Sequence, residues 1–181
     1  MNIWISPHND DEVLFGAFTL MREKPLVVIV TDSYIQAERG EKITADQRWE
    51  ETRAAMKILG CPVIRLGIRD DIIDKWAVEN KLSKFTGFYN VYIPALEFGN
   101  PHHDLINEVV QKIGNGIGQC IKQYRTYSKL DLHTIGGEEI VPTQEEIELK
   151  NKALACYTSQ LNLAATKPHF DAVYGKSEWF I

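Results

Sequence analysis

The 181-residue chain has 44% hydrophobic and 25% charged residues, a composition typical of a folded globular protein and unlike that of a disordered or fibrous one. Its length suits a single domain over residues 1–181. The net charge of -5 argues against nucleic acid or an anionic membrane as the main partner, since both select clustered Lys and Arg.

The N-terminal residues have the pattern of a first strand over 2–5, and no basic leader precedes them. No apolar run reaches the ~18–20 residues that a membrane span requires. We therefore expect a cytoplasmic protein without a membrane partner, and the sequence leaves a homo-oligomer open. Three widely spaced cysteines, Cys61, Cys120 and Cys156, are predicted to be buried free thiols.

Helix and strand patterns alternate after the first strand. Apolar residues at helical spacing predict a helix over 12–22, and the β-branched run 26–30 predicts a strand buried on both faces. A helix is expected over 44–60, because Thr44 suits an N-cap and Gly60 a C-terminal stop.

A third strand over 62–66 completes this repeat. The alternation predicts an α/β fold: a single-domain, Rossmann-like three-layer sandwich with a mostly parallel sheet. Further along the chain we expect a strand over 88–95 and helices over 104–124 and 143–165. The last helix would open with the capping box Thr143-x-x-Glu146.

The loop after the first predicted strand combines a histidine with three consecutive acids, from His8 to Glu12. In an open α/β sheet, ligands bind beyond the carboxyl ends of the strands, where this loop lies. His8 and Asp11 are good zinc ligands, which would leave Asp10 free for proton transfer. The acids could equally cap the helix that follows and complement its dipole.

A second group of histidines, His102 and His103, lies between another predicted strand and helix. Three of the five histidines of the chain fall in these two loops. If both loops meet at one sheet edge, an imidazole from the second completes a His/Asp/His set with an open position, which is typical of catalytic zinc. Iron, cobalt or manganese would also suit such ligands. The other two histidines, His133 and His169, are expected to be surface or packing residues.

Five segments now identify a family. The segment Pro7-His8-Asn9-Asp10-Asp11-Glu12 resembles the His-x-Asp-Asp-Glu motif of the LmbE/PIG-L zinc-dependent N-deacetylases. Four later segments are similar to further elements of that family, in the same order: Arg48-x-x-Glu51, Leu66-Gly67-x-x-Asp70, Asn100-Pro101-His102-His103 and Ala155-Cys156-Tyr157-Thr158-Ser159-Gln160. Three positions depart from it: Asn100 and His102 replace the His and Asp of His-Pro-Asp-His, and Tyr157 replaces a histidine.

The resemblance implies a zinc-dependent hydrolase that removes an acyl group from nitrogen. The metal ligands that it implies are His8, Asp11 and His103, with Asp10 as the general base. Glu12 is expected to orient His8 or to cap the helix, since ligand histidines usually need an outer partner.

The same resemblance implies a small substrate, an acylated amine or amino sugar. Three residues are expected to contact it: Arg48, Asp70 and Asn100. Two others are candidates to donate to the oxyanion or the leaving group: His102 and Tyr157. Taken without the resemblance, Arg48 could equally pair with an acid on its own helix, and Asp70 could belong to a turn.

Two other functions stay open. One is a zinc hydrolase of a different ester or amide bond, and the other is a catalytically degenerate metal-binding α/β module in which the three departures mark lost chemistry. A nucleotide-binding flavodoxin-like domain is less favoured, because the chain has no Gly-rich phosphate-binding motif.

Overall fold

The structure, a computed structural model, describes residues 1–32, 43–126, 137–164, 166–173 and 176–181. Its strands form one sheet in the order β3-β2-β1-β4-β5-β7-β6. They are β1 (Ile3–Ser6), β2 (Leu26–Asp32), β3 (Val63–Arg69), β4 (Phe88–Pro94), β5 (Gly118–Tyr124), β6 (Glu138–Ile140) and β7 (Glu178–Phe180). Neighbouring strands from β3 to β5 are parallel, whereas β7 is antiparallel to β5 and β6. The mostly parallel sheet confirms the prediction.

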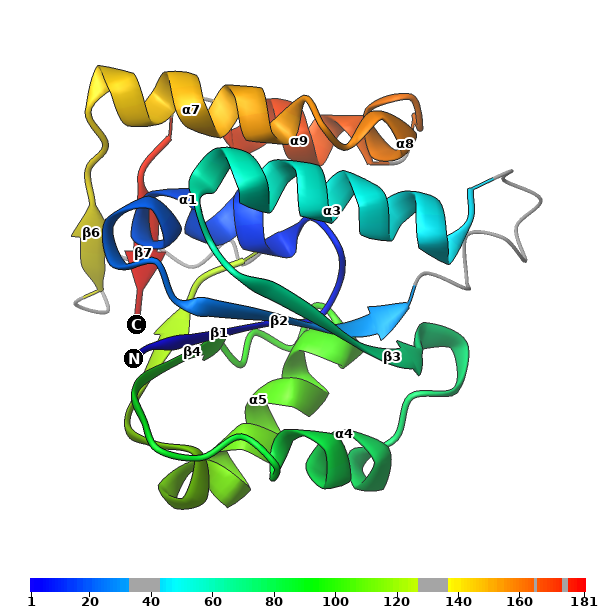
Figure 1. Cartoon of the computed structure of the whole chain (residues 1–181), viewed down its shortest axis with the longest axis vertical. Coiled ribbons are helices and arrows are strands. Elements are labelled where there is room, and N and C mark those ends of the chain that lie inside the picture. The colour runs from blue at the N-terminus through cyan, green and yellow to red at the C-terminus, as the bar shows by residue number, and fades with distance from the viewer. Residues whose placement is uncertain (33–42, 127–136, 165, 174–175) are drawn as a thin grey trace.

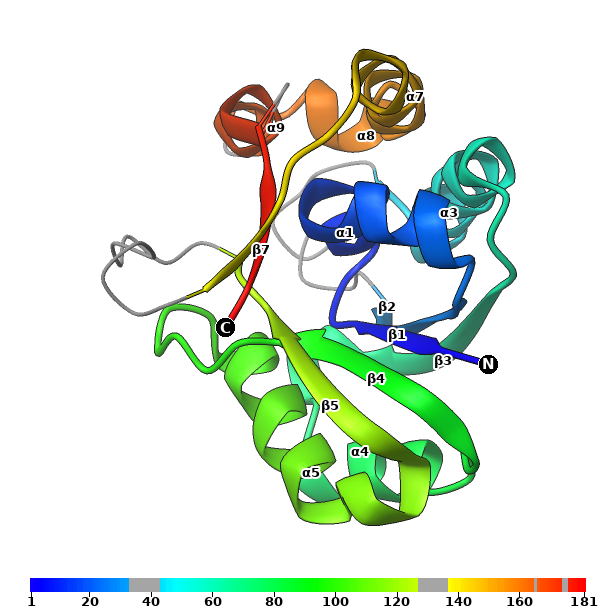
Figure 2. The ribbon, with the colours of Figure 1, turned by 90° about the vertical axis from the view of Figure 1, so that its left-hand side faces the viewer.

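Helices cover both faces of this sheet. They are α1 (Asp11–Glu23), α3 (Ala45–Leu59), α4 (Lys75–Leu82), α5 (Pro101–Ile117), α7 (Gln144–Leu154), α8 (Thr158–Leu161) and α9 (Lys167–Val173), with a 3₁₀ turn η1 (Asp70–Ile72). Figures 1 and 2 show α1 and α3 on one face, α4 and α5 on the other, and α7 to α9 outside α1 and α3. The predicted three-layer α/β sandwich is confirmed, and a further helical layer lies over one side of it.

Alternate residues of the central strands face two apolar clusters. Trp4 of β1 belongs to the cluster that includes α1 and α3 residues, whereas Ile3 and Ile5 belong to the cluster that includes α5 residues. Trp4 is fully buried and stacks on Tyr124, with ring centroids 4.2 Å apart. A Cβ atom at Gly16 would lie 2.3 Å from the Trp4 ring, so α1 requires a glycine there to pack this closely.

The predicted helix over 104–124 is wrong in its last third. Helix α5 ends at Ile117, and residues 118–124 form β5, paired in parallel with β4. A Cβ atom at Gly118 would lie 2.3 Å from a methyl group of Val91, so the glycine allows the two strands to approach. The strand carries Tyr124 into the core, where it is fully buried.

The predicted helix over 143–165 is also interrupted. Helix α7 ends at Leu154, and the short helix α8 begins only at Thr158. Between them Tyr157 has φ -84° and ψ 58°, which is not helical, and its side chain is fully buried. Burial of this tyrosine and the polar contacts of α8 override the helical periodicity. The capping box at Thr143 is present as predicted.

The cysteine prediction needs one correction. All three cysteines are free, as expected, and Cys61 is buried, but Cys156 is only half-buried and Cys120 is exposed. Cys120 lies on β5, which has its most exposed residues at this point of the strand. His169 is exposed on α9, as predicted, whereas His133 lies outside the described residues.

Within the described part of the chain, no helix combines the length and the apolar character that crossing a bilayer requires.

Candidate active site

The site lies where two neighbouring parallel strands, β1 and β4, end at the centre of the sheet. After β1 the chain enters α1 on one face, and after β4 it enters α5 on the other face (Figures 1 and 2). Open α/β sheets place their ligands at such a reversal, beyond the carboxyl ends of the strands. Both histidine-containing loops of the sequence follow these two strands.

The first loop has a strained backbone at Asp10, whose φ is 111°. A non-glycine residue in this region costs on the order of 1–3 kcal/mol, and such residues concentrate at functional sites. Asp10 is the N-cap residue of α1, yet its side chain makes no capping hydrogen bond. Its backbone N–H donates instead to Glu12 Oε2 at 3.0 Å. The carboxylate of Asp10 is therefore not used to cap the helix.

The second loop places two histidines in the first turn of α5. Asn100 is the N-cap residue and accepts a hydrogen bond from the backbone N–H of His102 at 3.0 Å. Pro101 follows at the start of the helix, a position that suits proline. Asp104 Oδ1 accepts from the backbone N–H of Phe98 at 3.1 Å and thereby holds the preceding loop against the helix.

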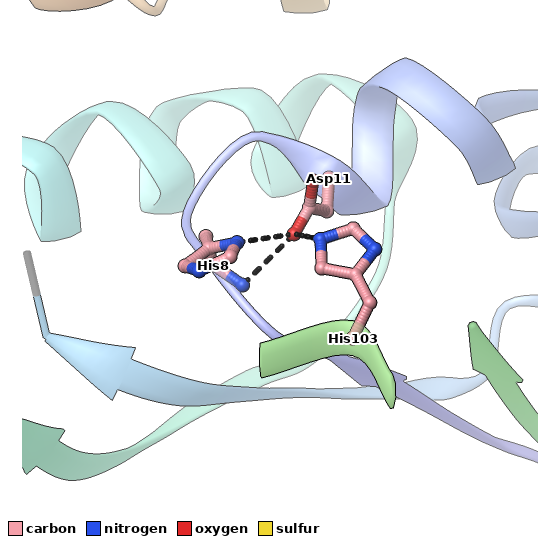
Figure 3. Close-up of side chains that lie close together, drawn as sticks. All are labelled: His8, Asp11 and His103. Carbon is pink, nitrogen blue, oxygen red and sulfur yellow. Dashed lines mark hydrogen bonds and ion pairs between the residues drawn. The ribbon is translucent and has the colours of Figure 1, made fainter. Parts of the chain in front are cut away.

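Three side chains from these loops converge on one point (Figure 3). His8 Nδ1 lies 2.9 Å, and His103 Nε2 3.1 Å, from Asp11 Oδ2. One ligand atom from each residue lies within 4.8 Å of the other two, which makes the set able to hold a metal ion. The expectation that the loops meet at one sheet edge is confirmed.

The chemistry of this donor set fits a divalent transition metal. Two imidazole nitrogens and a carboxylate oxygen are ligands that zinc accepts, and iron, cobalt or manganese accept them as well. Asp11 is 1% exposed, and its Oδ1 atom is buried without a hydrogen-bond partner among the described residues. A cation would satisfy that oxygen.

Burial and neighbouring charges shift the pKa values of the three neighbouring acids, and not all in the same direction. Burial raises the pKa of Asp10 to about 7, although Arg48 opposes the rise. Burial also raises the pKa of Glu12 to about 7. For Asp11, burial acts in the same direction, but the imidazoles of His103 and His8 outweigh it and hold its pKa below the usual range. Asp11 is thus the carboxylate best suited to bind a cation, whereas burial favours the protonated form of both Asp10 and Glu12.

Arg48 reaches this loop from α3. Its Nη2 lies 3.0 Å from Asp10 Oδ2 and also donates to the backbone carbonyl of Asn9. The side chain of Asn9 in turn donates to Thr52 Oγ1 at 2.9 Å. Arg48 is 5% exposed. The structure therefore places Arg48 against the predicted base, and contact with a substrate stays a prediction.

Glu12 and Tyr157 form a fully buried pair behind the loop. The Tyr157 hydroxyl donates to Glu12 Oε1, while Glu12 Oε2 accepts from the Asp10 N–H and from Ser6 Oγ, at 3.4 Å. Glu12 therefore supports the turn that begins α1, and none of its described hydrogen bonds reaches His8. Burial and the Glu12 charge raise the pKa of Tyr157 well above its ordinary value, so its hydroxyl keeps its proton.

His102 and Asp70 lie beside the three-residue cluster. His102 Nδ1 is 2.8 Å from His8 Nε2, and burial together with the neighbouring His8 lowers the pKa of His102 to about 4. Asp70 begins η1 after β3, is 7% exposed and acts on His102 as a nearby negative charge. The two residues are thus close to the predicted metal ligands, with a neutral imidazole at His102.

The sequence assigned no role to Glu51, which links α3 to α8. Its carboxylate accepts hydrogen bonds from Ser159 Oγ at 2.6 Å, from the Ser159 N–H at 2.8 Å and from Thr158 Oγ1 at 2.9 Å. Both ends of this link belong to segments that the sequence had singled out, Arg48-x-x-Glu51 and the one ending in Ser159-Gln160. Their pairing fixes the helix that carries Arg48.

Comparison with known proteins identifies one family and several solved structures of the same fold. The model of the family described as PIG-L, GlcNAc-PI de-N-acetylase, matches residues 3–113. A search of curated proteins finds no significant match.

Three solved structures share the architecture. The N,N'-diacetylchitobiose deacetylase from Pyrococcus horikoshii is 17% identical with a TM-score of 0.74, and the match covers 99% of this chain and 82% of that one. The zinc-inhibited form of the teicoplanin deacetylase Orf2 is 14% identical with a TM-score of 0.72, covering 99% and 97%. GalB, the 4-carboxy-2-hydroxymuconate hydratase from Pseudomonas putida KT2440, is 14% identical with a TM-score of 0.64, covering 99% and 94%. At these identities the likenesses establish the fold alone.

Proposed function

Because the chain belongs to the PIG-L family of de-N-acetylases, we propose that this N-deacetylase removes an acetyl or similar acyl group from the nitrogen of an amino sugar or related small amide. We propose a zinc ion as its cofactor, held by His8, Asp11 and His103, with another divalent transition metal as the alternative.

The observation that supports this most is the convergence of one carboxylate and two imidazoles from separate loops, next to a second carboxylate that does not join them. The motif of the first loop accounts for both carboxylates. When bound, the metal supplies Lewis acidity and lowers the pKa of water toward ~7. The remaining work falls to side chains of this chain.

Asp10 is the proposed general base. An Oδ atom of Asp10 accepts the proton of the water that attacks the amide carbonyl carbon, and the same carboxyl group returns a proton to the departing amine nitrogen. Burial raises the pKa of Asp10 and so favours the protonated carboxyl group that the second of these steps requires. Arg48, 3.0 Å away, keeps the carboxylate oriented.

The substrate contacts are proposals of the same kind. Asp70 and Asn100 follow β3 and β4 at the same edge of the sheet, where they could bind hydroxyl groups of a sugar. Arg48 contributes to this recognition only if its buried guanidinium reaches past Asp10. Of the two candidate donors to the oxyanion, half-buried His102 is better placed than Tyr157, whose hydroxyl already donates to Glu12.

Three alternatives require a direct test. The hydratase GalB has the same fold, so the architecture does not by itself select amide hydrolysis. The departures from the family pattern at Asn100, His102 and Tyr157 leave open a module that binds metal without turnover, or a hydrolase of another ester or amide bond.

The experiment is an assay of the full chain, loaded with zinc, cobalt or manganese, against a panel of substrates. The panel contains N-acetylglucosamine derivatives, simple N-acetyl amines, acetyl esters and unsaturated acids. Release of primary amine from the amino sugars, abolished by a chelator and restored by metal, is the expected result. Ester cleavage without amine release, hydration of the unsaturated acids, or stoichiometric metal without any turnover would each contradict the proposal.

A further inference from the structure

Both ring nitrogens of His8 face a specific partner. Nδ1 lies 2.9 Å from Asp11 Oδ2, on the side where the three-residue cluster converges (Figure 3). Nε2 lies 2.8 Å from His102 Nδ1, and the two rings are tilted by 48° with centroids 5.1 Å apart. The nitrogen that faces the cluster and the nitrogen that faces His102 are therefore different atoms.

This geometry fixes where the protons of the two imidazoles must lie when a metal is bound. A neutral imidazole carries one proton, and its ligating nitrogen must offer a lone pair. If His8 binds through Nδ1, its proton lies on Nε2 and is donated to His102 Nδ1. His102 must then accept at Nδ1 and carry its own proton on Nε2.

We propose that His102 is a positioning residue: it is the outer hydrogen-bond partner that fixes the orientation and tautomer of His8. This role rests on the proposed metal site, in which His8 is a ligand. Metal-ligating histidines usually donate their second N–H to a carboxylate, a backbone carbonyl or water. In this chain a second imidazole takes that place. His102 occupies the position at which the family motif His-Pro-Asp-His has its aspartate.

Neighbouring residues hold His102 in this position. Its backbone N–H is bound by the side chain of Asn100 at 3.0 Å, which caps the first turn of α5. The next residue, His103, is 2% exposed and points to Asp11. The same helical turn thus supplies one ligand of the cluster and the partner of another.

The role has a chemical consequence. A carboxylate partner draws the N–H proton strongly and makes the ligating nitrogen more basic, whereas a neutral imidazole does so less. The partner still selects one tautomer and one ring orientation for His8. Its removal should therefore weaken metal binding, and its replacement by a carboxylate should restore or strengthen it.

The test compares zinc and cobalt affinities of the full chain, measured by competition with a chromophoric chelator. The variants are His102→Ala and His102→Asp, and the control is His169→Ala, which removes an exposed histidine on α9. We expect the dissociation constant to rise about 10–100-fold in His102→Ala, because loss of an outer partner typically has this effect. His102→Asp should bind at least as tightly as the unmodified chain, and His169→Ala should not differ from it.

The visible spectrum of bound cobalt separates an outer partner from a direct ligand. We expect its band shape to be the same in the unmodified chain and in His102→Ala. A change typical of a lost nitrogen ligand would overturn the role assigned to His102, and so would unchanged affinity in His102→Ala.

Three further outcomes have defined meanings. An unmodified chain that binds neither metal would overturn both this role and the proposed function. If the unmodified chain releases amine and the His102→Ala variant binds metal equally well, the role of His102 is overturned and the proposed function is not. If thermal melting of the metal-free protein shows that His102→Ala is unfolded, the affinity of His102→Asp decides, and weaker binding there counts against the role.

Discussion

Helix α1 contacts two sets of buried charged side chains, which differ in how completely their charges and hydrogen bonds are paired. At its middle, Lys150 of α7 and Glu178 of β7 form an ion pair at 2.9 Å, and both side chains are at most 2% exposed. Lys150 Nζ also donates to the Leu14 carbonyl at 3.0 Å, while Glu178 accepts from the Phe18 N–H at 3.1 Å. This pair is neutral overall and hydrogen-bonded on both sides.

The other group lies at the N-terminal end of the same helix. Asp10, Asp11 and Glu12 are buried side by side, with one strained backbone angle and one carboxylate oxygen that has no partner among the described residues. The comparison separates two uses of buried charge. The balanced pair serves the packing of helices and strands, whereas we propose that the unbalanced cluster serves chemistry at a cost in stability.

The largest effect is expected for Asp10→Asn. The change removes the proposed base, so kcat for amine release should fall by about 10²–10⁴-fold. Metal content should stay intact. The free energy of unfolding should change little, because the variant loses the repulsion from Asp11 and Glu12 but also loses the charge that pairs with buried Arg48 at 3.0 Å. Steady-state kinetics, metal analysis and chemical denaturation check this. Normal turnover would remove Asp10 from the mechanism.

Breaking the balanced pair of Lys150 and Glu178 should lower stability and leave metal binding unchanged. Lys150→Met leaves Glu178 buried without its counter-ion, which should lower the free energy of unfolding by about 3–5 kcal/mol. The double change Lys150→Met, Glu178→Leu should recover much of that loss, because no buried charge remains unpaired. Metal affinity of the folded fraction should not change in either variant. A loss of affinity at intact stability would mean that this pair also serves the site.

Metal should stabilise the unbalanced cluster. At a free zinc concentration 100 times its dissociation constant, the free energy of unfolding should rise by about 2.7 kcal/mol. The Asp11→Asn variant should show no such rise, whereas Lys150→Met should show it in full. Thermal melts with zinc and with a chelator measure the difference.

The smallest effect concerns a pair near the surface. Arg22 of α1 binds Glu146 of α7 at 2.7 Å, and this hydrogen bond holds the pKa of Glu146 down to about 2, from 4.5. A depressed pKa contributes stability above pH 4.5, and that contribution is lost as the pH falls through about 2. Glu146→Gln should therefore lower stability at pH 7 by about 1 kcal/mol, and the difference should disappear near pH 2.

Part of the fold could be predicted because its signals are local. The apolar run of β2 and the ends of α3 needed no tertiary information: Thr44 accepts from the Gln47 N–H, and Gly60 ends the helix with φ 71°. Strands β5 and β7 could not be predicted in this way. β5 is polar and directly follows α5, and the glycines at their boundary weaken a helix without specifying a strand, which forms by parallel pairing with β4.

In the site, too, some features follow from local sequence and others depend on tertiary contacts. The residues of the cluster lie in local motifs, and the reversal of the chain at the centre of a parallel sheet brings those motifs together. The roles of their neighbours depend on contacts that no motif encodes. Tyr157 meets Glu12 across 145 positions of sequence, and His102 meets His8 across 94.

The most direct test of the central claim is metal stoichiometry, measured by elemental analysis of protein dialysed against zinc. The account predicts one zinc ion per chain in the unmodified protein and in Asp10→Asn, and none in Asp11→Asn or His103→Ala. Zinc bound equally well by all four proteins, or by none of them, would contradict it.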